Sequence, residues 1–237
     1  MKKRIIRALA CIVFTAALTF SSAAATINGY YGDNTDYAYE YADIAGDTAI
    51  ATVNDEELPA ELYTYWVAYY ERQVYDNFDM GDADVDWDGY YQATSVTLED
   101  YVKSASLQTA AVFMLVEQKA EELGVTLTDA QQEELNSYEE NQVSEYGLEG
   151  YYESLKYNCA SSDMIIYMNG LNMLFENIVA QECDGASVDS DEADELMTEW
   201  KQDSSLVAQE GYESFDIQTF YDNYISALSE IDPDYYN

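Results

Sequence analysis

The sequence predicts a mainly α fold, built from several helices with a small two-stranded β element. Three long stretches carry apolar residues at helical spacing: 59–78, 99–123 and 162–182. Strand character is confined to two short stretches, 49–53 and 205–208, which we expect to pair because unpaired strand backbone is costly to bury. Apolar residues make up 48% of the 237-residue chain, enough to build a core. We therefore assign residues 48–231 to one helical domain.

The helix predicted over residues 99–124 is expected to lie at the centre of this domain. Its middle, residues 110–116, is apolar on every side, and a helix with this pattern is buried all round. Thr97 is the expected N-terminal cap, and Gly124 suits the C-terminal stop. The apolar run is far shorter than the roughly 20 residues that span a bilayer. We therefore expect no transmembrane helix in the mature chain.

The remaining elements follow from similar patterns. After the strand at 49–53, the chain is expected to turn at Asn54-Asp55 and to enter its first helix at Pro59. Later helices are predicted, in chain order, at 128–147, 148–157, 161–185, 189–200 and 217–228.

The first 25 residues have the three parts of a secretion signal. A basic start is followed by an apolar region from Ile5 to Phe20 and by a small-residue cleavage site at Ala23–Ala25. We expect cleavage after Ala25 and a secreted or cell-envelope protein, with a retained N-terminal anchor as the alternative. Cys11 lacks the context of a lipidated cysteine.

The ends of the mature chain carry no periodic pattern. Residues 26–47 mix Tyr, Asp, Gly and Asn, and we expect a flexible, acidic, Tyr-rich tether. Residues 232–237 are expected to form a short tail.

The charge balance excludes several classes of partner. The chain has nine Lys and Arg against 47 Asp and Glu, a formal net charge of −38. Four of the nine cations lie in the signal, so the mature chain keeps five against 47, a net charge of −42. This balance excludes nucleic-acid binding through a basic surface and disfavours anionic membranes. It favours cationic partners, although adaptation to an extracellular medium explains the same charge.

The chain contains no histidine. Serine–histidine and cysteine–histidine catalysis, and zinc sites that need histidine, are therefore excluded. No nucleophile–base spacing is visible, and we expect no catalytic residues and no enzyme activity.

One acidic loop resembles the start of a calcium site. Asp84, Asp86, Asp88 and Gly89 match the opening of an EF-hand loop. The twelfth position is Ser95, where that loop needs a bidentate Glu. A solvated loop is therefore favoured, no cofactor is expected, and weak calcium binding remains the alternative.

The two cysteines of the mature chain are expected to be separate thiols. Cys159 and Cys183 bracket one predicted helix. A rise of about 1.5 Å per residue separates their Cα atoms by about 36 Å. A disulfide requires less than about 7 Å, so the alternative is a helix that folds back at Asn169-Gly170.

Several segments of the sequence resemble a known protein family. The strand-turn-helix of residues 50–66, the stretch 86–135 and the helix 189–200 are similar to the N-terminal domain of extracytoplasmic chaperones of the SurA and PrsA type, in the trigger-factor/SurA peptide-binding superfamily. The similarity covers roughly residues 48–202. It implies a multi-helix SurA N-terminal-like domain that binds unfolded polypeptides.

The sequence departs from this family at the place where the family carries its prolyl-isomerase domain. The family usually inserts a parvulin prolyl-isomerase domain of about ninety residues at this point, whereas only about 35 residues follow Trp200. Residues 200–216 resemble the family's closing segment, which normally lies beyond the isomerase. The resemblance therefore implies a chaperone core without its isomerase.

The favoured function is binding of unfolded or exported polypeptides without catalysis. Alternatives are an acidic surface binding or scaffold protein on the same fold, and an isomerase-family member that has lost its enzyme domain. Met and aromatic side chains suit varied apolar clients, although ordinary core packing explains them too. The candidate client-binding residues are Tyr63, Trp66, Tyr69, Tyr70, Met164, Met168, Phe220 and Tyr224.

Overall fold

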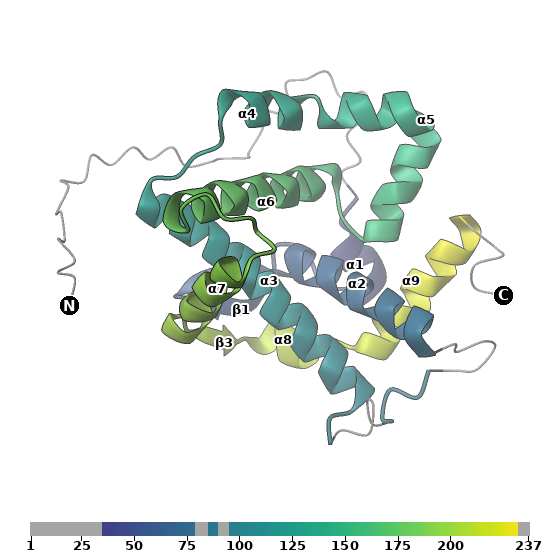
Figure 1. Ribbon diagram of the computed structural model, residues 1–237. Coiled ribbons are helices and arrows are strands. Elements are labelled where there is room, and N and C mark those ends of the chain that lie inside the picture. The colour runs from purple at the N-terminus through teal and green to yellow at the C-terminus, as the bar shows by residue number, and fades with distance from the viewer. Residues whose placement is uncertain (1–34, 79–84, 90–94, 232–237) are drawn as a thin grey trace. The chain divides into compact units, whose positions relative to one another are not determined.

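The protein is mainly helical with a small antiparallel sheet, as predicted (Figure 1). The computed structural model describes residues 35–78, 85–89 and 95–231, apart from the side chains of residues 75–78. The chain divides into two compact units, residues 1–30 and 31–237, and every described residue lies in the second. The predicted signal, residues 26–34 of the predicted tether, Asp84 and the tail at 232–237 lie outside the described residues.

Helices account for most of the described chain. They are α1 (Tyr37–Ala42), α2 (Ala60–Phe78), α3 (Leu98–Leu123), α4 (Asp129–Asn136), α5 (Tyr138–Asn158), α6 (Ser162–Glu182), α7 (Asp191–Asp203), α8 (Glu210–Ser214) and α9 (Ile217–Ile231). The strands are β1 (Ala49–Val53), β2 (Glu56–Pro59) and β3 (Leu206–Ala208).

The sheet has three strands in the order β2-β1-β3, not the two predicted. The predicted pairing is confirmed, because β1 and β3 are antiparallel with Thr52 opposite Val207. The additional strand arises at the turn. Asn54 and Asp55 both take left-handed backbone conformations (φ 51° and 71°), so the chain folds directly back onto β1. Pro59 therefore ends β2 instead of opening the first helix.

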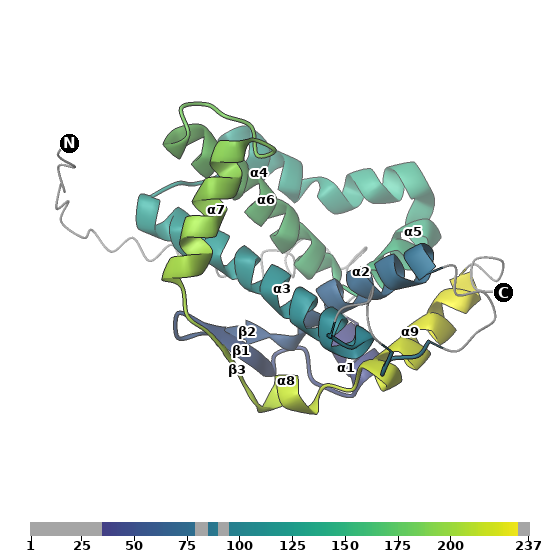
Figure 2. The same cartoon turned by 60° about the horizontal axis from the view of Figure 1, so that its bottom comes forward.

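Helix α3 is the central element, as predicted. Thr97 caps it through the backbone N–H of Asp100, and Gly124 ends it with φ 67°. It packs against α2, α6 and α7 and also contacts the sheet. Figures 1 and 2 show α2 and α3 lying side by side.

The segment after α3 differs from its prediction in where the helices break. A capping box between Thr128 and Gln131 starts α4, but this helix ends at Asn136. Helix α5 then runs across the predicted boundary and bends at Gly147, whose φ of 76° and ψ of 167° are not helical. The bend is visible in Figure 1, where the second half of α5 turns towards α2. The glycine therefore marks a kink within a helix, not an end.

The prediction of a flexible tether is wrong for residues 35–47. This segment contains α1, whose N-cap Asp36 accepts hydrogen bonds from the backbone N–H groups of Tyr39 and Gly46. Tyr37 and Tyr41 are buried against α9. The helix has only six residues, too few to show a helical period, so its order comes from tertiary packing.

The C-terminal segment closes the domain. The unpredicted helix α8 lies so close to β1 that a Cβ on Gly211 would sit 2.7 Å from the carbonyl oxygen of Ala49. Helix α9 then packs against α1, α2 and α5. Within the part of the chain that the structure describes, no helix is long and apolar enough to cross a bilayer.

Candidate functional site

Three of the predicted client-binding residues lie in the core. Tyr63, Phe220 and Tyr224 are each 0% exposed. The rings of Tyr63 and Phe215 pack edge to face at 5.0 Å, and those of Phe220 and Tyr224 stack at 5.7 Å. These three side chains therefore offer no surface to a client in this structure, and their rings hold α8 and α9 against α2.

The two predicted methionines are also core residues. Met164 and Met168 on α6 are 8% and 4% exposed. Their long, unbranched side chains fill the core, which was the alternative given for them. They offer little surface to a partner.

The other three predicted residues lie on the surface and belong to a larger group. Aromatic rings on α2 and α3 form one continuous chain of ring contacts, with centroids 5.1–6.1 Å apart. We call this surface the outer aromatic face. It consists of Tyr65, Trp66, Tyr69, Tyr70, Tyr101 and Phe113. Tyr69 is 39% exposed, and the other five are half-buried.

The outer aromatic face follows the line along which α2 and α3 meet. Trp66 packs on Phe113 at 5.2 Å, and the Tyr70 hydroxyl shares a 2.9 Å hydrogen bond with the Thr109 hydroxyl. Moving along α2 therefore moves backwards along α3, as in an antiparallel helix pair. Trp66 Nε1 is buried and has no hydrogen-bond partner among the described residues. An unsatisfied buried donor is uncommon and is costly for stability alone.

An acidic residue lies one turn beyond the aromatic row of α3. Glu117 follows Phe113 by four residues, and its carboxylate accepts a 2.6 Å hydrogen bond from the Tyr167 hydroxyl of α6. Burial, together with this carboxylate, raises the pKa of Tyr167 well above its usual range, so Tyr167 stays a donor. The face therefore combines apolar rings with negative charge.

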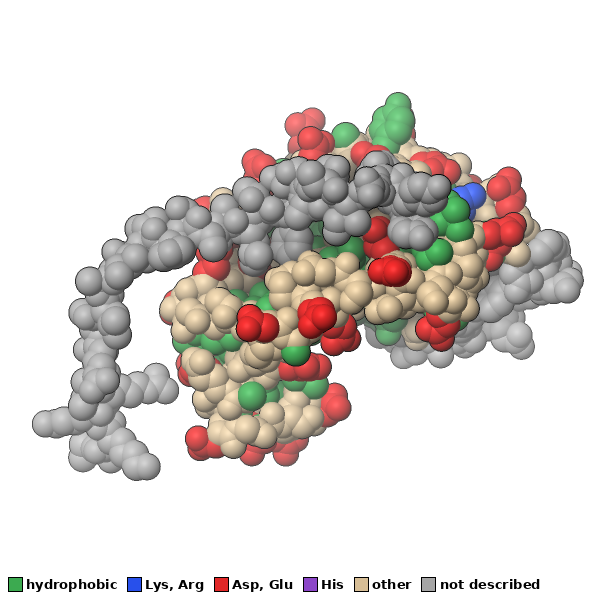
Figure 3. Space-filling model, turned by 90° about the horizontal axis from the view of Figure 1, so that it is seen from above, with side chains coloured by type: hydrophobic (Ala, Val, Ile, Leu, Met, Phe, Trp, Pro, Cys, Tyr) green, Lys and Arg blue, Asp and Glu red, His purple; other side chains and the backbone are tan. Residues whose placement is uncertain are grey.

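Acidic side chains are also spread over the rest of the surface. Figure 3 shows Asp and Glu across the visible face, with hydrophobic patches between them and little Lys or Arg. This distribution agrees with the strongly negative net charge.

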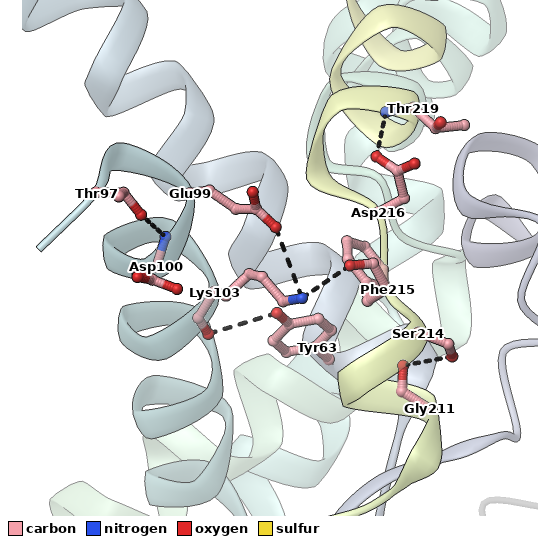
Figure 4. A network of polar contacts seen from close by, with 10 residues as sticks. All are labelled: Tyr63, Thr97, Glu99, Asp100, Lys103, Gly211, Ser214, Phe215, Asp216 and Thr219. Carbon is pink, nitrogen blue, oxygen red and sulfur yellow. Dashed lines mark hydrogen bonds and ion pairs between the residues drawn. The ribbon is translucent and has the colours of Figure 1, made fainter. Parts of the chain in front are cut away.

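Two of the few cations tie the C-terminal segment to the helices beneath the outer aromatic face. Lys103 on α3 donates from Nζ to the carbonyl oxygen of Phe215 at 2.9 Å and lies 3.9 Å from Glu99 (Figure 4). The Tyr63 hydroxyl donates to the carbonyl oxygen of Lys103 at 3.4 Å. These contacts join α2, α3 and the chain between α8 and α9.

The second cation, Arg72, is buried on α2. It donates through Nη1 to the Tyr224 hydroxyl and to the carbonyl oxygen of Tyr157, and its guanidinium lies 4.4 Å from the centre of the Tyr157 ring. The neighbouring Glu71 is 1% exposed, and neither carboxylate oxygen has a hydrogen-bond partner in the described chain. Burial raises the pKa of Glu71 well above its usual range, although Arg72 opposes the shift.

The acidic loop is organised around an aromatic side chain. Asp84 lies outside the described residues, whereas Asp86 and Asp88 are exposed. Trp87 between them is 6% exposed and packs edge to face on Tyr221 at 5.2 Å. Within residues 35–78, 85–89 and 95–231, no group of three or more Asp, Glu or Cys is placed to hold a metal ion. Asp84 and residues 90–94 of the candidate loop lie outside the described residues, so weak calcium binding stays an untested alternative.

An acidic hollow of about 320 Å³ lies where α1, α2 and the start of α6 meet. Its lining residues are Thr35, Asp36, Gly46, Asp47, Glu61, Ser161 and Asp163. Glu61 accepts a 2.5 Å hydrogen bond from Ser161, and burial raises the pKa of its carboxyl. Asp36 and Glu61 are therefore already used by the fold, as an N-cap and as a hydrogen-bond acceptor.

Cys159 and Cys183 are separate thiols, as predicted. Cys159 ends α5 and is 0% exposed, whereas Cys183 ends α6 and is half-buried. Burial is the main cause that raises the pKa of both thiols, so neither is an activated nucleophile.

The sequence pattern does not identify Tyr65, Tyr101 and Phe113 as members of the outer aromatic face. Tyr101, Ala105, Thr109 and Phe113 do form a row at steps of four, and all four are half-buried. The sequence predicts a wholly buried helix here, so it gives this row no exposed side. Its partly exposed state depends on which side of α3 lies against α2, and one helix alone does not contain that information.

Comparisons with known proteins identified no relative. No family model matches the sequence, no curated protein matches it, and no solved structure matches the fold.

Proposed function

We propose that this protein binds unfolded, exported polypeptides on its outer aromatic face and performs no catalysis. The observation that carries the proposal is the continuous, partly exposed chain of aromatic rings across α2 and α3. Unfolded chains expose apolar side chains that folded proteins bury, and such a surface gives them a place to pack.

Aromatic rings suit this task for a physical reason. Tyr and Trp offer a large contact area with few rotatable bonds, so little conformational entropy is lost when they bind. Ring contacts within the face restrain these side chains further, because each ring packs against at least one other. A preorganised apolar surface of this kind accepts varied sequences.

The charge supports the same proposal. A strongly negative protein repels its own copies and keeps a complex with an unfolded client soluble. It also attracts clients rich in Lys and Arg, and Glu117 places a carboxylate beside the rings. The resemblance to SurA-type chaperones, which also bind unfolded chains, favours this class of client.

The absence of catalysis in this proposal rests on side-chain chemistry. The sequence has no histidine, and both described cysteines have raised thiol pKa values. We therefore expect no acceleration in a proline-peptide isomerisation assay.

The direct test is suppression of aggregation of a reduced, unfolded client such as lysozyme. The protein as it exists should suppress light scattering at near-stoichiometric ratios. The double variant Trp66→Ser/Tyr69→Ser removes two contacting rings of the outer aromatic face. It should remove most of this effect, because it interrupts the row of aromatic rings where that row is exposed. The matched control is Tyr146→Ser, which removes a ring that is 58% exposed on α5, outside the face.

Two results would contradict the proposal. Equal suppression by the Trp66/Tyr69 variant and the Tyr146 control would place client binding elsewhere. No suppression by the unmodified protein would instead favour the alternative, an acidic surface scaffold.

A further inference from the structure

Strand β3 forms one edge of the sheet. The strand order β2-β1-β3 leaves it with a single partner, β1. Leu206 and Val207 are 38% and 53% exposed, and Ala208 is exposed too. Figures 1 and 2 show no described element on the outer side of β3.

The hydrogen bonds between β1 and β3 determine which backbone groups of β3 are used. The N–H of Asn54 donates to the carbonyl oxygen of Ser205 at 3.0 Å. At the other end of the strand, the N–H of Gln209 donates to the carbonyl oxygen of Ile50 at 2.9 Å. Bonded and non-bonded pairs alternate along an antiparallel ladder. Val207, midway between these two pairs, therefore also faces β1.

Leu206 and Ala208 lie between the bonded positions, so their N–H and C=O groups point away from β1. Among the described residues, neither makes a backbone hydrogen bond to anything outside the β1–β3 ladder. Two donors and two acceptors, on residues separated by Val207, are thus available to another strand. This is the arrangement used when an extended peptide adds to a sheet.

Of the features that usually protect an edge strand, β3 has only its short length of three residues. Natural edge strands carry Lys, Pro or a bulge that blocks pairing with another chain. The sequence of β3 is Leu-Val-Ala, and its pairing with β1 is regular from Ala51 to Val53. An exposed, apolar and regular edge is costly to keep unless it has a partner.

The charge around the edge indicates what kind of partner fits. Between residues 199 and 216 there are five carboxylates and one lysine. Asp203 and Glu210, on either side of β3, are both exposed. A second copy of this chain carries the same negative charge and is repelled.

We propose that the free edge of β3 binds an extended apolar peptide segment flanked by Lys or Arg, which adds to the sheet as a fourth strand. The inference rests on the proposed function, because such a segment is part of an unfolded client. Backbone pairing would hold any sequence, and the flanking carboxylates would select basic ones.

The first test is direct peptide binding, measured by fluorescence anisotropy. The probe is a labelled peptide of alternating Val and Thr with two Lys at each end, and the control peptide has Glu in place of each Lys. The Lys peptide should bind, and more weakly as salt is added, whereas the Glu peptide should bind at least about tenfold more weakly.

The second test removes one outward donor without touching the ladder. Ala208→Pro lacks the N–H that faces away from β1, a position where an edge strand tolerates proline. Its affinity for the Lys peptide should fall about tenfold. The matched control Ala208→Thr keeps the N–H and should bind normally.

Hydrogen exchange on the unmodified protein provides a readout that does not depend on a variant folding. The peptide should slow exchange of the amides of Leu206 and Ala208, while that of Val207, already bonded to β1, should change little. Equal peptide binding by Ala208→Pro and Ala208→Thr, or no slowing at Leu206 and Ala208, would overturn the proposal. So would a dimer that Ala208→Pro dissociates, since the occupant would then be a second copy.

The outcomes separate this inference from the proposed function. If the protein suppresses client aggregation but does not bind the Lys peptide, the inference fails and the proposed function stands. If the peptide binds and protects these amides while aggregation is not suppressed, the edge site stands and the proposed function fails.

Discussion

The guanidinium of Arg72 on α2 donates a hydrogen bond to the hydroxyl of Tyr224 on α9, 152 residues away in the chain. The Tyr224 hydroxyl in turn donates to the carbonyl oxygen of Tyr157 at 2.6 Å, and Arg72 donates to the same oxygen. Three helices, α2, α5 and α9, are thereby joined by one buried cation. The outer aromatic face lies on α2, so this joint also fixes the element that carries most of its rings.

Replacing Arg72 with methionine should destabilise the protein strongly. The change keeps an unbranched apolar stem, but it leaves the Tyr157 carbonyl with one donor fewer and removes a buried charged hydrogen-bond donor. Removing one member of a buried, charged hydrogen-bond network lowers the unfolding free energy by about 3 kcal/mol. Urea denaturation followed by circular dichroism measures the difference.

The matched control is Lys119→Met, which removes a cation from a surface pair with Glu122. Surface pairs contribute little, so its cost should stay below about 1 kcal/mol. Similar losses for the two variants would mean that Arg72 stabilises only through general charge.

Glu71→Gln should change how stability depends on pH. Burial raises the pKa of Glu71 in the folded protein well above the 4.5 that is usual for a glutamate carboxyl. Below pH 4.5 the carboxyl is protonated in both states, and its contribution to stability is fully present. As pH rises through the folded pKa, that contribution is lost, because the unfolded chain releases the proton more easily. The wild type should therefore lose stability relative to Glu71→Gln as pH rises.

The measurement is the unfolding free energy of both proteins from pH 4 to pH 9. The difference in unfolding free energy between Glu71→Gln and the wild type should widen by up to about 1.4 kcal/mol per pH unit. It should stop widening once the pH passes the pKa of Glu71 in the folded protein. General charge repulsion affects both proteins alike and cancels in the difference. Glu134→Gln, at an exposed position on α4, is the control and should run parallel to the wild type. A parallel curve for Glu71→Gln would refute the prediction.

Much of the fold was predictable because it depends on local patterns. Helical spacing located α2, α3, α6 and α9, and Thr97 and Gly124 marked the ends of α3. The pairing of β1 with β3 was predictable as well, since an isolated strand needs a partner. These signals are contained in the residues of each element.

Features that depend on tertiary packing were not predictable in this way. Six residues of α1 show no helical period and are ordered by contact with α9. Glu56–Pro59 became a strand because two consecutive left-handed residues return the chain onto β1. Neither contact is visible in the segment itself.

The candidate site was predictable only in part, for a related reason. Tyr63 and Trp66 belong to the same apolar stripe of α2, yet Tyr63 is fully buried and Trp66 lies on the partly exposed face. A stripe identifies apolar positions but does not say which neighbour covers each one. The packing of α8 covers Tyr63, through Tyr212 and Phe215, and leaves Trp66 against Phe113.

The two cysteines should differ in their reactivity in the folded protein. Cys183 is half-buried and should react slowly with a thiol reagent, whereas Cys159, 0% exposed, should react only after unfolding. The raised pKa of each thiol lowers its thiolate fraction and slows the reaction further. Mass spectrometry after timed alkylation without reductant measures both rates. Equal rates in the native protein would show that the end of α5 opens readily.

A truncation ending at Gln202 should lose cooperative folding, although it keeps every helix from α1 to α6 and most of α7. It removes β3, α8 and α9, and with them the buried side chains of Phe215, Phe220 and Tyr224. Removing a single large core aromatic typically costs about 3–5 kcal/mol, and total domain stability is only about 5–15 kcal/mol. Thermal unfolding by circular dichroism should therefore show a broad, low transition. A truncation ending at Ile231 retains every described element and should melt with the full-length protein. Should the Gln202 truncation also melt cooperatively at that temperature, the C-terminal segment would not be part of the folding unit, and the network from Arg72 to Tyr224 would have no role in stability.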